Sequence, residues 1–130
     1  MQDYLFAAAV LAVLIGVVYS VLGEVLIFRR LRKGGLVPTQ AAPPLAERHI
    51  RILWATWHVV TVFGFAFATM LYKLGSVDTA VSIQSVVLTA TGAAFLGGAI
   101  LVLVGTKGSH PGWIGLAGAA ALVVMATRAA

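Results

Sequence analysis

Two ionisable side chains stand out because they lie within long apolar segments of the sequence. Glu24 comes five residues before the basic pair Arg29-Arg30, and His58 comes seven residues after Arg51. A carboxylate or an imidazole inside a membrane segment is costly unless it is paired, so such groups are candidates for function. At matching depths on neighbouring helices, Glu24 and His58 can share a proton, bind an ion or ligate a metal.

A third candidate, His110, follows the third apolar segment and directly precedes Pro111. Proline is favoured at the first position of a helix, so His110 is expected to cap the last helix on the same side of the membrane as Glu24. Arg51 is expected at the mouth of this group. We therefore predict one polar or ligand-binding site formed by Glu24, His58, His110 and Arg51.

This predicted site admits three interpretations, because no spacing motif such as H-x-x-x-H is present. In the first, a buried hydrogen bond or ion pair sets the register of two helices. In the second, Glu24 and His58 exchange protons with a substrate or an ion. In the third, Glu24, His58 and His110 ligate a metal, or His58 ligates a haem. The sequence itself assigns neither a cofactor nor a catalytic residue.

The elements that must position these side chains are membrane helices. Hydrophobic residues make up 61% of the 130 residues and charged residues 10%, and the mean hydropathy is +1.02. A soluble domain cannot carry that much apolar surface. In lipid an α-helix satisfies every backbone N–H and C=O group, and the alternation typical of membrane barrel strands is absent. The composition therefore predicts an all-α membrane protein.

Four apolar segments approach or exceed the length that crosses about 30 Å of hydrocarbon. We expect a single transmembrane domain over residues 1–130, with cytoplasmic loops at 29–51 and 105–111. The four expected helices cover about 4–28, 52–72, 81–104 and 112–129. Small residues spaced four apart allow close helix packing, which predicts a compact four-helix bundle of two hairpins.

Lysine and arginine are concentrated in the first connection, and this predicts the orientation of the chain. The positive-inside rule places both loops in the cytoplasm and both termini outside, in the inner (cytoplasmic) membrane of a bacterium. Arg29, Arg30, Arg32 and Lys33 are expected to contact anionic lipid headgroups. These contacts account for the net charge of +5, and we expect no nucleic-acid partner.

Three classes of function fit this organisation. The loops are too short for a soluble enzyme domain and cysteine is absent, so the first expectation is an accessory or structural membrane subunit. Its expected partners are membrane lipids and either copies of itself or a larger membrane complex. The alternative is a small proton-coupled transporter or channel, and a second alternative is an intramembrane metal- or haem-dependent enzyme. No sequence motif places the chain in a known family.

Overall fold

The computed structural model describes residues 2–76 and 82–129, and this part of the chain is almost entirely helical. A short 3-10 helix, η1 (Phe28–Leu31), follows the first α-helix. The four α-helices are α1 (Gln2–Leu26), α2 (Glu47–Gly75), α3 (Ile83–Thr106) and α4 (Gly112–Ala129). The prediction of an all-α fold with four helices is confirmed.

Local hydrogen bonds explain where α3 begins and ends. At its start the Ser82 hydroxyl oxygen accepts the backbone N–H of Ser85 at 3.1 Å, which satisfies one of the free N–H groups of the first turn. At its end Lys107 adopts a left-handed conformation with φ of 53°, and the N–H of Gly108 reaches the carbonyl of Leu103 at 2.9 Å. This geometry closes the helix and turns the chain toward α4.

The helix bounds differ from the sequence prediction on both sides of the first connection. The first helix ends at Leu26, earlier than expected, and the second begins at Glu47 rather than near residue 52. Hydropathy marks the part of a helix that fits in hydrocarbon, whereas charged residues such as Glu47 and Arg48 continue a helix well beyond it. The predicted start of the third helix, at residue 81, lies outside the described residues.

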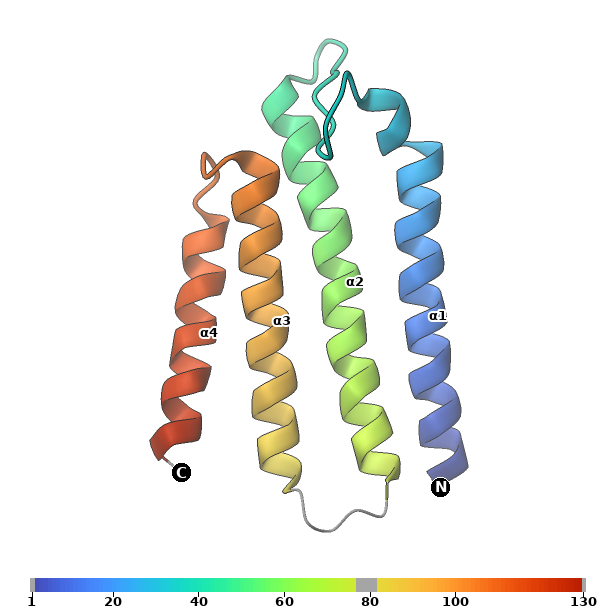
Figure 1. Cartoon of the computed structure of the whole chain (residues 1–130), viewed down its shortest axis with the longest axis vertical. Helices are drawn as coiled ribbons and strands as arrows, with labels where there is room; N and C mark the ends of the chain where they lie inside the picture. Colours follow the sequence, from blue (N-terminus) through green and yellow to red (C-terminus); the bar gives the residue numbers. More distant parts are fainter. Residues whose placement is uncertain (1, 77–81, 130) are drawn as a thin grey trace.

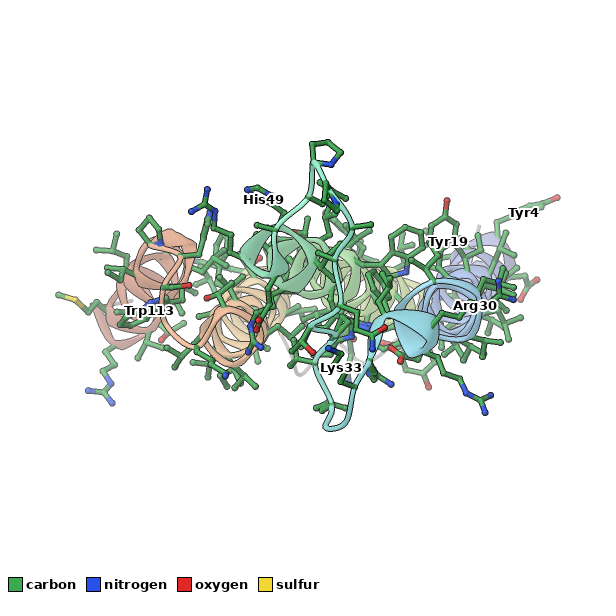
Figure 2. The ribbon with its side chains drawn as sticks, turned by 90° about the horizontal axis from the view of Figure 1, so that it is seen from above. Tyr4, Tyr19, Arg30, Lys33, His49 and Trp113 are labelled. Carbon is green, nitrogen blue, oxygen red and sulfur yellow. The ribbon has the colours of Figure 1, made fainter. Side chains whose placement is uncertain are left out.

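The four helices stand side by side in a single row, as Figures 1 and 2 show. The extensive helix contacts within the described residues are α1 with α2, α2 with α3, and α3 with α4. The predicted compact bundle is therefore wrong, and the fold is an open layer. Each helix packs on its neighbours in the sequence. In lipid no hydrophobic effect drives such a row to close, because lipid tails are as apolar as the side chains.

Most of the large apolar side chains point out of this layer. Val10 on α1 is 59% exposed, Val60 on α2 is 64% exposed and Leu122 on α4 is 67% exposed. Three helices, α1, α2 and α3, are long and apolar enough to cross a membrane, and α4 is a shorter apolar helix. Such a surface is suited to lipid rather than to water.

The two ends of the layer differ in character. One end of the layer contains the start of α1, the end of α2, the start of α3 and the end of α4 (Figure 1). The arginine-rich connection and the α3–α4 turn lie at the other end, as the predicted orientation requires. Which end faces the cytoplasm remains a prediction from the charge pattern.

A small apolar core lies near the arginine-rich end, where α2 and α3 approach each other closely. Phe28, Trp54, Ala55 and Val102 are its buried members. Gly105 permits this approach, because a Cβ atom at that position would lie 2.8 Å from the Cβ of Ala55. That distance is too short for two carbon atoms, so a larger residue would push α3 away from α2.

We therefore expect Gly105→Ala to destabilise the helix layer by about 1–3 kcal/mol through overpacking. The matched control is Gly64→Ala on α2, where an added Cβ would meet nothing within 4 Å. Thermal unfolding in detergent micelles, followed by circular dichroism, compares the two variants. Equal melting temperatures for both would show that the close approach at Gly105 is not a stabilising contact.

Candidate functional site

Glu24, near the end of α1, is the centre of a polar cluster between α1 and α2. The indole Nε1–H of Trp54 donates to its Oε2 atom at 3.3 Å. The Nε2 atom of His58 lies 3.7 Å from the same oxygen, which is within ion-pair range but longer than a hydrogen bond. The guanidinium of Arg32 forms an ion pair with the other carboxylate oxygen. The carboxylate is thus contacted from helix α2 and from the loop that follows η1.

The spacing of residues on the two helices brings these groups together. Trp54, His58 and Thr61 lie along one face of α2, at intervals of four and three residues, and this face meets α1. On α1, Ser20 and Glu24 are four residues apart and therefore lie on one face as well. The small residue Gly23 lets the two helices approach, since a Cβ atom at that position would overlap the ring of Trp57.

Arg32 reaches Glu24 because the chain turns back after η1. The backbone N–H groups of Thr39 and Gln40 both donate to the carbonyl of Leu31, at 2.9 and 2.8 Å. These bonds close residues 32–38 into a loop at the end of the layer (Figure 2). The loop starts beside α1, so the side chain of Arg32 folds back onto the carboxylate.

A chain of hydrogen bonds continues from His58 toward the middle of α1. The hydroxyl of Ser20 lies 3.1 Å from Nδ1 of His58 and 2.8 Å from the hydroxyl oxygen of Thr61. The Thr61 hydroxyl in turn donates to the carbonyl of Gly16 at 3.4 Å. When Ser20 donates to Nδ1, the neutral imidazole carries its proton on Nε2, facing Glu24. These hydrogen bonds therefore link His58, which faces Glu24, to the α1 backbone.

The cluster lines a hollow of about 470 Å³ that opens on one side of the layer. The side chains of Glu24, Arg32 and His58 are 29%, 21% and 19% exposed, so the cluster is neither fully buried nor freely solvated. Leu36 from the loop and Leu101 from α3 form apolar walls. The hollow thus combines paired charges with apolar surface.

Two of the four residues expected at this site lie elsewhere. His110 is exposed at the start of α4, where its Nδ1 atom accepts the backbone N–H of Gly112 at 3.1 Å, so it caps the helix as expected. The guanidinium of Arg51 pairs with Glu47, one turn earlier on α2, at 3.3 Å. Neither residue lines the hollow. The open layer explains the separation of His110, because α4 packs on α3 and not on α1.

The predicted metal ligands Glu24, His58 and His110 are therefore not assembled. In residues 2–76 and 82–129, no three histidine, aspartate or glutamate side chains come together in a way that could hold a metal ion. Glu24 and His58 alone are close enough to act on a common group. Together they suit the binding of a polar group or the movement of a proton.

Arg32 was expected to contact lipid headgroups together with its basic neighbours, and its role in the cluster was not predicted. The structure pairs it with Glu24 instead, because a carboxylate at this position needs an opposite charge. Arg29, Arg30 and Lys33 are exposed and remain available to lipid. Helical spacing from Glu24 and His58 could have identified Ser20 and Thr61, whereas the return of Arg32 depends on the loop.

Comparison of the chain with protein-family models, with curated proteins and with solved structures finds no match. The cluster around Glu24 is therefore the strongest indication of function that the chain offers.

If Glu24 and Arg32 stabilise each other, the combined effect of Glu24→Gln and Arg32→Gln on the free energy of unfolding should be smaller than the sum of their separate effects. Each single substitution leaves one charge without its partner, so we expect a coupling free energy on the order of 1–3 kcal/mol. Reversible unfolding in mixed micelles measures it.

The exposed Arg30→Gln is the control for this cycle, because it removes the same charge from the same end of the layer. It should change the free energy of unfolding by less than about 0.5 kcal/mol. Strictly additive effects of the two substitutions in the Glu24–Arg32 cycle would contradict the pairing.

Proposed function

We propose that the chain is a small accessory or structural subunit of a membrane assembly, and that it docks on another membrane-protein chain through one face of its helix layer. The proposal includes the orientation expected from the charge pattern, with the arginine-rich end in the cytoplasm of a bacterial cell. The observation that carries it is the partly exposed cluster of Glu24, Arg32 and His58 on that face.

The two faces of the layer are unlike. The hollow beside Glu24 meets a second hollow, between α2 and α3, at Val62. That second hollow shares Thr69 with a hollow between α1 and α2, and shares Thr89 and Ala93 with one between α3 and α4. Because neighbouring hollows have common walls, they lie on one side of the row, which we call the grooved face.

Helix α2 has the same asymmetry in its side chains. The polar residues of its membrane-spanning part that line these hollows are His58, Thr61 and Thr69. The opposite helix face is apolar apart from the exposed Thr56, and its large side chains protrude, with Leu53 51% exposed and Phe67 60% exposed. The opposite face therefore suits lipid, while the grooved face suits a partner.

The cost of exposing an ion pair to hydrocarbon supports a partner on the grooved face. His58 lies seven residues beyond Arg51, where the apolar segment of α2 begins, which is about 10 Å along the helix at a rise of ~1.5 Å per residue. Charged groups partly open to lipid at such a depth are unfavourable, and covering them with another polypeptide removes that contact. Alanine and glycine residues along the grooves let a partner helix approach closely.

The hydrogen bonds that link His58, Ser20 and Thr61, together with Glu24 at 3.7 Å from His58, favour a second candidate, a small proton-coupled transporter. The two functions differ in what Glu24→Gln changes. In a docking subunit the substitution weakens association, whereas in a transporter it abolishes flux and leaves association intact.

Photo-crosslinking in cells tests the docking function. A benzophenone amino acid replaces either Phe65, on the grooved face, or Phe67, on the opposite face, and both native side chains are exposed by more than a third. We expect a protein adduct of discrete mass from position 65 and lipid adducts alone from position 67. Mass spectrometry then shows whether the partner is a second copy or a different chain.

The Glu24→Gln variant extends this experiment, because it unbalances the cluster without altering position 65. Loss of most of the adduct would support docking through the cluster. Lipid adducts alone at both positions, or equal protein adducts at both, would contradict a single docking face.

A further inference from the structure

Residues 32–36 form a strap beside the polar cluster, and little backbone packing fixes its position. The segment ends at Val37, which packs on the apolar core, and its tip near Lys33 projects beyond one side of the helix row (Figure 2). A Cβ atom added at Gly34 or Gly35 would meet nothing among the described residues within 4 Å, so the tip does not pack on the helices. The strap is therefore positioned by its side chains.

Two side chains of the strap line the hollow of the cluster. Leu36 forms an apolar wall but is 67% exposed, so it contributes little packing. Arg32 pairs with Glu24, and its Nε–H group makes no hydrogen bond within the described residues. The guanidinium is thus bound by one carboxylate, and the position of the strap depends on that ion pair.

The carboxylate that binds the strap also faces His58, whose Nε2 atom lies 3.7 Å from its Oε2 atom. The imidazole is 19% exposed, so it is not sealed from the surroundings of the layer. Among the described residues, the charged groups that line the hollow with it are Glu24 from α1 and Arg32 from the strap. Helix α3 contributes the apolar Leu101, and Phe28 of η1 lies with its ring centroid 6.3 Å from that of the imidazole. The charge of His58 therefore acts on one anion and one cation.

The hydroxyl groups on the other side of the imidazole can serve both of its charge states. When His58 is neutral, the Ser20 hydroxyl donates to Nδ1 at 3.1 Å. When Nδ1 gains a proton, the Ser20 oxygen can accept it, and Ser20 then donates to the hydroxyl oxygen of Thr61 at 2.8 Å. Thr61 already donates to the carbonyl of Gly16. Rotation of one hydroxyl thus satisfies either state, so protonation of the imidazole leaves none of these groups without a partner.

Protonation of His58 changes the balance of charge around Glu24. One carboxylate compensates one cation, and a second cation in a hollow partly open to lipid is costly. His58 is fixed on a helix, whereas Arg32 lies on the strap, and its long side chain can carry its charge to the polar end of the layer. Arg32 is therefore the cation that leaves, and its departure restores one cation beside one anion.

We propose that His58 is a proton-operated switch for the strap, in which protonation of the imidazole transfers the Glu24 carboxylate from Arg32 to His58 and releases residues 32–36. Histidine suits this role because its charge changes within the physiological range of pH. Release of the strap removes the Leu36 wall and opens the hollow. The switch goes beyond the docking function, because it acts within one chain and requires no partner.

A nitroxide label at Leu36→Cys reports the mobility of the strap, and the chain has no cysteine of its own. The purified protein is studied by electron paramagnetic resonance in nanodiscs of phosphatidylcholine, which carries no net charge. Between about pH 8 and about pH 5 we expect the rotational correlation time of the label to shorten about twofold, because the released strap moves faster. The midpoint should coincide with the titration of His58, followed by NMR of isotope-labelled histidine. A correlation time that is constant or longer at low pH would overturn the switch.

Three variants in the labelled background assign the response. His58→Gln should abolish the transition, whereas the control His110→Gln, which removes an exposed imidazole at the same end of the layer, should keep it. Arg32→Gln removes the ion pair, so the strap should be mobile at both pH values. Circular dichroism checks that each variant is folded.

A transition that persists in His58→Gln, or that is lost in His110→Gln, would assign the response to another group and overturn the proposal. A midpoint different from that of the His58 imidazole would do the same. A strap that stays immobile in Arg32→Gln would show that the ion pair does not position it. These measurements involve no partner chain, so the docking function is tested separately by crosslinking at Phe65 and Phe67.

Discussion

The pairing of Glu24 with Arg32 is the interaction on which the rest of this structure depends. A carboxylate in an apolar helix must find an opposite charge or several hydrogen-bond donors, since isolation in a medium of low dielectric constant is prohibitively costly. Here the partner comes from the loop and the donor Trp54 from the neighbouring helix. One carboxylate thus ties together the end of α1, the loop that follows it and the face of α2.

The open layer is compatible with a lipid surrounding, because three of its helices are long and apolar enough to cross a membrane. Helices in lipid gain little from hiding apolar surface, so close contacts at small residues decide which helices pack. In this chain those contacts join helices that are neighbours in the sequence. Gly16 and Gly23 on α1 lie against side chains of α2, and Gly98 and Gly105 on α3 lie against side chains of α2. A row built in this way has two broad faces, and the unequal distribution of polar groups makes one of them suited to association.

The sequence predicted the parts of the fold that hydrocarbon dictates. Long apolar segments had to be helices. Glu24 and His58 lie at similar depths from the basic connection, which indicated that they could meet, and their side chains do lie close together. It failed where the answer depends on tertiary packing. The lateral order of helices separated His110 from the cluster, and a loop reversal closed by backbone hydrogen bonds brought Arg32 onto Glu24. Neither feature leaves a local pattern in the residues.

The distance between α1 and α4 tests the open layer most directly. Spin labels at Leu11→Cys and Leu122→Cys lie on exposed positions of the two outer helices, and the chain has no cysteine of its own. Three neighbour spacings of about 8–10 Å predict a separation of about 25–30 Å between the helix axes. Pulsed electron paramagnetic resonance in nanodiscs, with labelled protein diluted in unlabelled protein, should give a distance in that range. A main distance consistent with directly packed helices, about 8–10 Å between axes, would contradict the account.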